Sequence, residues 1–315
     1  MNSSNDLVNS VLNDVKSFDS DYQIQNKFDF TGQTLKTWKK SANHAITILE
    51  DHGVNYTLIK AYDVPFALMD DVDILVENQI ELRKLYTNLI ETGFTFRHVP
   101  FNDELKLAAM NKELDVEIDF YPDSKWSELR YAKQGLISQN RIKKTVHGIE
   151  AFIPKPEHEI VIIASHAYYH GRINLLEVLH TIRTISNEEL NFEEIFQLSK
   201  SFHMQNGTLI LLSIVDQLLE NYGFNVLPKK ILEGLNEISQ KRFQNLAKKS
   251  FEFEDFPIKF SIPDLLCSSL SKITAKNLDG SSGRFDELLG FIKHNRFANS
   301  IYLRFSKKYN SFVPN

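Results

Sequence analysis

The chain has 315 residues, of which 42% are hydrophobic and 24% charged, as in an ordinary globular protein. It contains only 12 glycines and neither GxGxxG nor GxxxxGK[ST], which excludes the dinucleotide-binding and P-loop classes that hold phosphate on glycine-rich loops. The 36 Lys and Arg residues against 41 Asp and Glu residues give a net charge of −5, which argues against a protein that coats nucleic acid through a basic surface. Because Cys267 is the only cysteine, an intrachain disulfide and a cysteine-rich zinc site are excluded, and we expect a cytoplasmic protein.

The first part of the chain shows no sign of membrane targeting. Its polar, acidic N-terminal residues lack the cationic start and apolar stretch of a secretory signal. The longest apolar stretches, such as residues 209–215, fall short of the roughly 20 residues that span a bilayer. We therefore expect no membrane partner, and we expect residues 1–28 to form a loosely attached lead-in segment.

The next segments alternate between helical and extended patterns. Apolar residues at three-and-four spacing predict a helix over 31–53, which ends at a glycine in the position typical of a helix C-terminus. A short apolar stretch follows at 56–60, and the alternation of the segment DDVDILVE (70–77) predicts a strand. Residues 77–93 predict another amphipathic helix, also closed by a glycine.

The pattern then becomes mainly extended and later mainly helical. We expect three strands of a meander at 94–101, 104–110 and 112–123, a short helix at 126–132 and a strand at 149–154. From Pro156 onward the period is helical, which predicts helices near 157–170, 173–186, 192–204, 208–222, 228–248 and 285–307. The fold class is therefore α+β, with a lead-in segment (1–28), a mixed-sheet domain (29–155) and an all-helical domain (156–315).

Carboxylates gather on one face of two of the predicted strands. Period-two alternation places Asp71 and Asp73 on one face of the first strand and Val72, Ile74 and Val76 on the other. On the strand DVEIDFY, the same rule places its three carboxylates and a tyrosine together, opposite the apolar face: Asp115, Glu117, Asp119 and Tyr121.

Such a row of acids needs partners. Two carboxylates about 4 Å apart repel by roughly 4 kcal/mol at an effective dielectric constant near 20. Spacing in water, basic side chains or a divalent cation such as Mg²⁺ or Mn²⁺ can offset this repulsion. Two ions of this kind can activate an attacking hydroxyl and stabilise a leaving oxygen. The alternative interpretation is a solvated strand face whose charges prevent edge-to-edge aggregation.

Three segments together resemble the DNA polymerase β-like nucleotidyltransferase superfamily. They are VNYTLIKAYDVPFALMDDVDILVE, ELDVEIDFYPD and IPKPEHEIVIIASHAYYH, and their order and spacing are similar to the uncharacterised prokaryotic and archaeal branch with a helical C-terminal half. The resemblance covers about residues 45–225. It implies a small mixed-sheet nucleotidyltransferase core followed by an all-helical domain, and an enzyme that uses a nucleoside triphosphate (NTP), such as ATP, with Mg²⁺ or Mn²⁺.

The resemblance also implies roles for particular residues. Asp71 and Asp73 match the paired metal-binding carboxylates, and Asp119 matches the third carboxylate, which helps to deprotonate the attacking hydroxyl. Glu117 is the alternative for the third position because it shares the face. Lys60 lies where the branch often reads LKG, just before the catalytic loop.

The triphosphate-binding positions depart from the family pattern. The superfamily usually has Gly-Ser or Gly-Gly about ten residues before the paired carboxylates, and this chain has Ala61 and Tyr62 there. We assign nucleotide contact to Lys60, Ala61, Tyr62 and a histidine of the helical half, His166. The acceptor is open between RNA, protein and a small molecule.

Two alternatives to a nucleotidyltransferase stay open. The departure at Ala61 and Tyr62 favours a non-catalytic binding or regulatory module of the same fold, for example one half of a toxin–antitoxin-like pair. A glycosyltransferase that binds its metal through the DxD pair is a third hypothesis. It leaves the carboxylates around Asp119 unexplained.

Three other groups of residues have local alternatives. His166 and His170 share a helix face. Three interpretations are open: a pair of zinc ligands, a contact to nucleotide, or a structural contact at the domain junction. Arg141, Lys143 and Lys144 either meet phosphate or form a solvated turn. The loop at 279–284 binds an anion at a helix N-terminus or is a plain connector.

Overall fold

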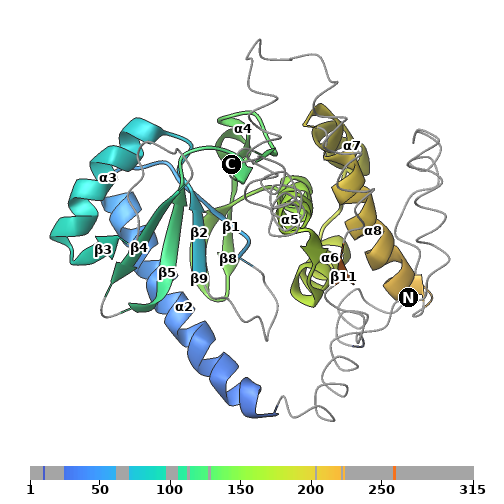
Figure 1. Ribbon diagram of the computed structural model, residues 1–315, viewed down its shortest axis with the longest axis horizontal. Coiled ribbons are helices and arrows are strands. Elements are labelled where there is room, and N and C mark those ends of the chain that lie inside the picture. The colour runs from blue at the N-terminus through green and yellow to red at the C-terminus, as the bar shows by residue number, and fades with distance from the viewer. Residues whose placement is uncertain are drawn as a thin grey trace, which may run out of the picture.

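The computed structural model describes residues 10, 25–61, 71–96, 106–111, 114–126, 129–202, 204–220, 223 and 258–259. A five-stranded sheet with helices packed against it lies beside a group of mostly helical segments (Figure 1). The expected α+β class with a small mixed sheet is therefore confirmed.

The sheet has the strand order β1-β2-β5-β4-β3. Its bounds are β1 (Thr57–Ile59), β2 (Asp71–Leu75), β3 (Phe94–Phe96), β4 (Leu107–Asn111) and β5 (Leu114–Tyr121). The predicted meander is confirmed, because β3, β4 and β5 pair antiparallel in chain order. β2 pairs antiparallel with β1 and parallel with β5, which makes the sheet mixed and puts the two carboxylate-bearing strands side by side.

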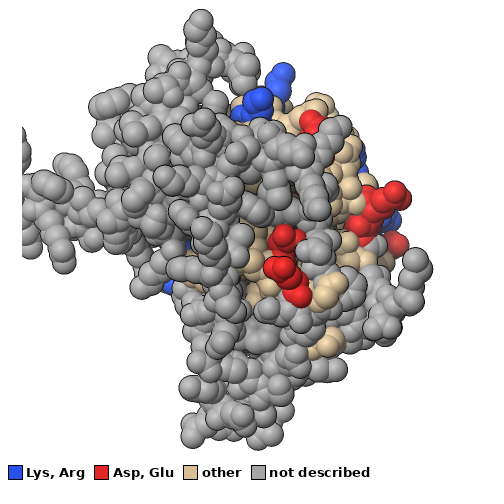
Figure 2. Space-filling model, turned by 90° about the vertical axis from the view of Figure 1, so that its right-hand side faces the viewer, with Lys and Arg blue, Asp and Glu red and all other residues tan. Residues whose placement is uncertain are grey.

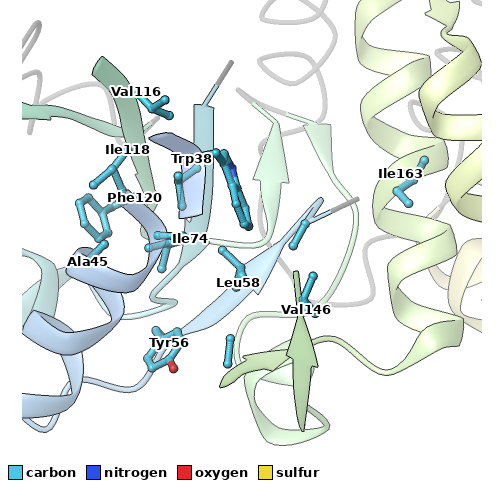
Figure 3. Packing of buried hydrophobic residues seen from close by; sticks show 14 of the residues in the cluster. Trp38, Ala45, Tyr56, Leu58, Ile74, Val116, Ile118, Phe120, Val146 and Ile163 are labelled. Carbon is cyan, nitrogen blue, oxygen red and sulfur yellow. The ribbon is translucent and has the colours of Figure 1, made fainter. Parts of the chain in front are cut away.

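Helices α2 (Gln25–Asp51) and α3 (Gln79–Glu91) bury their apolar stripes in the largest core cluster. α2 begins at Gln25, earlier than the predicted start at residue 31, and it packs against β2 and β5. The indole of Trp38 and the side chains of Ala45, Ile74 and Phe120 converge in this core (Figure 3). The predicted alternation holds for the described side chains, since Val72 and Ile74 of β2 and Val116, Ile118 and Phe120 of β5 belong to this cluster.

The opposite face of the sheet is covered at the ends of β2 and β5. A second cluster there joins Leu75 and Tyr121 of the sheet to Trp126 and to Ile162 of helix α5 (Pro156–His170). The predicted helix at 126–132 is wrong, because the chain forms a small hairpin, β6 (Lys125–Trp126) and β7 (Leu129–Arg130). The reason is tertiary: Trp126 is buried, and its indole Nε1 donates a 2.9 Å hydrogen bond to Ser165 Oγ on α5.

A second hairpin lies next to β1. Strand β9 (Ile149–Ile153) confirms the strand predicted at 149–154, and it pairs with β8 (Ile142–Val146), which the sequence analysis treated as a turn or a basic stretch. His147 and Gly148 both have positive φ at the connection, as two-residue hairpin turns require. The short helix α4 (Leu136–Gln139) precedes this hairpin.

The helical half begins as predicted at Pro156. Helices α5, α6 (Leu175–Asn187), α7 (Phe192–Ser201) and α8 (Gln205–Glu220) agree with the first four predicted helices to within a few residues. A two-stranded pair, β10 (Arg172–Ile173) with β11 (Ile258–Lys259), joins this region to a later part of the chain. The helices predicted at 228–248 and 285–307 and the loop at 279–284 lie outside the described residues, and the division into domains stays a prediction.

Figure 2 shows the charged side chains of the described residues on one face of the molecule. On the face shown in Figure 2, the described acidic and basic residues form small separate groups, and this part of the face carries no continuous basic surface. Among the described residues, no helix combines the length and the apolar character that a membrane crossing requires.

Candidate metal centre

The parallel pairing of β2 with β5 determines which carboxylates meet. Asp73 lies directly opposite Asp119, and Asp71 lies opposite Glu117. One carboxylate oxygen from each of Asp71, Asp73 and Asp119 lies within 4.8 Å of the other two. Glu117, the alternative for the third position, is not part of this group. The backbone at Asp71 is fixed from α2, because Trp38 Nε1 donates a 2.9 Å hydrogen bond to its carbonyl oxygen.

Both oxygens of Asp73 have partners among the described residues. Lys60 Nζ lies 2.7 Å from Asp73 Oδ2, and the hydroxyl of Tyr121 donates a 2.9 Å hydrogen bond to Oδ1. The side chains of Lys60 and Asp73 are only 6% and 4% exposed. The contact is therefore a buried ion pair and not a surface one.

Asp119 is fully buried and only half satisfied. Its Oδ2 is paired with the ammonium of Lys106 and lies 3.5 Å from the hydroxyl of Tyr121. Its Oδ1 has no hydrogen-bond partner among the described residues. A buried carboxylate oxygen without a partner is costly, and here it points to a missing cationic partner beside Asp71 and Asp73.

The electrostatic balance of the cluster favours the same conclusion. Burial raises the pKa of Asp73 to about 7. The positive charge of Lys60 opposes this shift, and the negative charges of Asp71 and Asp119 reinforce it. Burial likewise raises the pKa of Asp119, although Lys106 opposes it. Two ammonium groups therefore do not compensate for three carboxylates in this setting. The all-oxygen donor set is the kind that Mg²⁺ and Mn²⁺ prefer, so the residues fit a hard divalent cation.

Lys60 is held by contacts from several elements. Its φ of 51° lies in the left-handed region, and its ammonium lies 4.9 Å from the ring centroid of Trp126. Burial works to lower the pKa of Lys60, but the charges of Asp73 and Asp71 outweigh it and raise the pKa above its usual value. Lys60 is therefore a cation fixed at the edge of the carboxylate cluster.

The helical half reaches this lysine through one histidine. Nε2 of His166 lies 3.3 Å from Lys60 Nζ, and its Nδ1 lies 3.2 Å from Glu177 Oε1 at the start of α6. The ring of His166 packs edge-on against that of Trp126. His166, predicted to contact nucleotide, is thus placed behind Lys60, and His170 packs against its ring.

The remaining predicted residues lie apart from the carboxylates or outside the description. Ala61 is buried in the core next to Lys60, and Tyr62 lies outside the described residues. Arg141 donates to Asn55 Oδ1, while Lys143 and Lys144 pair with Glu150 and Glu188. These three basic residues therefore belong to the β8–β9 region and do not adjoin the carboxylate cluster.

A cavity lies beside the carboxylate cluster but does not include it. Its empty volume is about 540 Å³ with the open mouth included, and it is bounded by β1, the β8–β9 hairpin, α5 and α6. It is lined by apolar side chains and by a polar set: Lys144, Glu159, His180, Arg183, Thr184 and Glu188. It adjoins the metal centre at Ala61, the residue after Lys60, and at Glu159, which accepts a backbone hydrogen bond from Lys60.

Several residues of the centre were not assigned by the sequence analysis. Lys106, Tyr121 and Glu177 contact the cluster or its lysine, yet only Tyr121 carried a signal, because it shares the strand face with Asp119. Trp126 was placed in a helix. No local pattern identifies Lys106 or Glu177, since their partners lie far along the chain or on another element.

Comparison with known proteins adds little to this geometry. No protein-family model and no curated protein matches the chain. A crystal structure of an antigenic nucleotidyltransferase-like protein from Paracoccidioides brasiliensis is similar over 65% of this chain and 99% of that one, with 13% sequence identity and a TM-score of 0.44. A similarity of this size carries no argument about activity.

Proposed function

We propose that the chain is a metal-dependent nucleotidyltransferase, which transfers a nucleoside monophosphate from an NTP to a hydroxyl acceptor and releases pyrophosphate. The observation that carries the proposal is the convergence of carboxylate oxygens of Asp71, Asp73 and Asp119 from two parallel strands to within 4.8 Å of one another, with no partner for Asp119 Oδ1 among the described residues. An acidic strand face that served only solubility would spread its charges into water, and Asp73 and Asp119 are instead buried.

The proposed reaction is an in-line displacement at the α-phosphorus. The acceptor oxygen forms a new bond to that phosphorus, while the bond from the α-phosphorus to the bridging oxygen breaks and its electron pair leaves with pyrophosphate. The hydroxyl proton passes to a carboxylate, and Asp119 is the residue assigned to promote this transfer. A raised pKa, as burial gives Asp119, makes a carboxylate a better proton acceptor.

The cation and the lysine have separate roles in this proposal. Asp71, Asp73 and Asp119 would hold the Mg²⁺ or Mn²⁺, which supplies stabilisation of negative charge on the phosphate oxygens when bound. Lys60 provides a fixed positive charge where the family uses a glycine-containing loop. Because it is buried and ion-paired, it is pre-oriented for phosphate oxygens at little entropic cost.

A second candidate is a non-catalytic module of the same fold, and one observation favours it. Lys60 and Lys106 already pair with Asp73 and Asp119 and neutralise part of the cluster without any metal. In such a module the carboxylates would be structural, and added cation would bring no nucleotide binding. The acceptor of the catalytic candidate, whether RNA, protein or a small molecule, stays open, as does the third hypothesis of a DxD glycosyltransferase.

The test is transfer of label from an NTP labelled at its α-phosphate, with Mg²⁺ or Mn²⁺, to separate pools of RNA, protein and small hydroxyl compounds. We expect Asp71→Asn and Asp73→Asn to abolish the metal-dependent transfer. Glu117→Gln is the matched control, because Glu117 lies on the same strand as Asp119 but outside the cluster. Undiminished transfer by the two Asn variants would exclude the assignment, and metal-independent nucleotide binding without transfer would favour the module.

A further inference from the structure

A chain of hydrogen bonds runs from the metal centre into the helical half of the protein. It begins at Asp73, passes through the ammonium of Lys60 to His166 on α5, and ends at Glu177 in the first turn of α6. Glu177 is 2% exposed, and its second carboxylate oxygen accepts a 2.7 Å hydrogen bond from the backbone N–H of Asn174. The buried carboxylate is thus fixed at both oxygens.

The hydrogen-bonding capacity of each group determines where the protons lie. An ammonium group has three N–H donors and no acceptor, so His166 Nε2 must accept the hydrogen bond from Lys60. Neutral imidazole then carries its proton on Nδ1, which donates to Glu177 Oε1 at 3.2 Å. In a histidine, the partner of one ring nitrogen sets the state of the other.

The alternative proton arrangements conflict with the same contacts. A doubly protonated ring would direct an N–H at the Lys60 ammonium, and burial together with the charge of Lys60 lowers the pKa of His166 well below its usual range. A ring protonated only on Nε2 would also place two donors face to face. One arrangement alone gives every contact a donor and an acceptor.

We propose that Glu177 is a positioning residue of the candidate metal centre. By accepting the Nδ1 proton of His166, it holds the imidazole in the tautomer whose Nε2 lone pair keeps the Lys60 ammonium against Asp73. The functional meaning of this arrangement rests on the proposed nucleotidyl transfer, but the position of the proton does not. The helical half therefore sets the geometry of the site from behind and does not merely face the nucleotide.

Replacement of Glu177 by glutamine should invert the hydrogen bond. The glutamine oxygen can still accept from the Asn174 backbone, which leaves its NH₂ group facing His166 Nδ1. Nδ1 must then accept, so the proton moves to Nε2 and opposes the ammonium. The matched control is Glu157→Gln. Glu157 is also buried, and it also accepts a hydrogen bond from a backbone N–H at the start of a helix, that of Asn191. Among the described interactions it has no contact with His166.

The experiment is nuclear magnetic resonance of the full chain labelled with ¹⁵N in histidine, with the His166 signals assigned from their loss in His166→Gln. We expect Nδ1 to be the protonated nitrogen in the wild type and in Glu157→Gln, and Nε2 to be the protonated one in Glu177→Gln. A wild-type ring protonated on Nε2 would overturn the inference without the need for a variant. So would a Glu177→Gln ring that keeps its proton on Nδ1.

The outcome is separable from the fate of the proposed function. If the ring has the expected tautomer but the Asp71→Asn variant transfers label normally, the positioning network stands and the enzymatic proposal fails. If His166 has the other tautomer but Asp71→Asn abolishes transfer, the positioning network fails and the enzymatic proposal stands.

Discussion

Lys60 Nζ lies 2.7 Å from Asp73 Oδ2, and both side chains are almost completely buried. Lys60 stands directly after β1 and Asp73 lies in the middle of β2, so the ion pair links the two strands at the metal centre. Removal of one partner from a buried pair leaves an uncompensated charge and is far more costly than loss of a surface pair.

Lys60→Met should therefore destabilise the protein strongly near neutral pH. We expect the free energy of unfolding to fall by about 3–5 kcal/mol, as is usual when a buried charge loses its partner. Lys143→Met is the control, because Lys143 pairs with Glu150 on the exposed surface and should change stability by less than about 1 kcal/mol. Urea unfolding of the two variants measures the difference, and equal losses would contradict a buried ion pair.

The resemblance predicts the group Asp71, Asp73 and Asp119, but the alternation of the strands alone does not choose Asp119 over Glu117. Alternation alone places Asp71, Asp73 and Asp119 on one side of their strands. The choice of Asp119 over Glu117 depends on the register between β2 and β5, which is set by a parallel pairing across a long intervening segment. Glu117 and Asp119 lie two residues apart on the same face, so a register shift of two residues would exchange them, and the local pattern cannot determine this choice.

Elements fixed by distant contacts were missed for the same reason. The apolar content of 126–132 suggests a helix, yet the hydrogen bond from Trp126 to Ser165 and the burial of Trp126 against α5 stabilise a hairpin. Glu177 has the local appearance of an ordinary capping residue at the start of α6, and this capping box is present. Its contact with His166 adds a second role that only the packing of α5 against α6 reveals.

Glu159, on the wall of the cavity, should make stability depend on pH. Burial raises its pKa to about 8, although a backbone hydrogen bond from Lys60 and the Lys60 charge oppose the shift while Asp73 reinforces it. Its Oε1 faces Nε2 of His180 at 3.8 Å, where burial lowers the pKa of that histidine to about 3. Both groups are thus uncharged across most of the range between these values.

The sign follows from the folded and unfolded states of Glu159. The unfolded chain releases this proton near pH 4.5, whereas the folded chain holds it until about pH 8. The stabilisation that comes from protonated Glu159 is fully present below about pH 4.5 and is lost as the pH rises through about 8. The loss amounts to a few kcal/mol in total, roughly. Relative to Glu159→Gln, wild-type stability should fall between about pH 5 and about pH 8 in urea unfolding. Glu150→Gln, at an exposed position, is the control, and a constant difference for Glu159→Gln would refute the expectation.

Gly207 lies where α8 packs tightly against α5. A Cβ at this position would lie 3.2 Å from Tyr168 Cβ and 3.3 Å from the carbonyl oxygen of Ala164. Alanine is the better helix former by about 1 kcal/mol, but overpacking of a rigid contact costs about 1–3 kcal/mol. We expect Gly207→Ala to lower the free energy of unfolding by about 1 kcal/mol.

The control for this substitution is an exposed position on the same helix. Glu220→Ala should change stability by no more than about 0.5 kcal/mol. A Gly207→Ala variant more stable than the wild type in thermal and urea unfolding would show that the two helices can move apart, contrary to the close contact described.

Direct binding of Mn²⁺, counted by electron paramagnetic resonance, tests the central claim that Asp71, Asp73 and Asp119 form a cation site. The wild type and Glu117→Gln should bind the ion with similar affinity, because Glu117 lies outside the cluster. Asp71→Asn and Asp119→Asn should each weaken binding by at least about tenfold. Substitution of residues that only hydrogen-bond to metal ligands already lowers metal affinity by about that factor. Equal Mn²⁺ binding by all four proteins, or none by the wild type, would contradict the account.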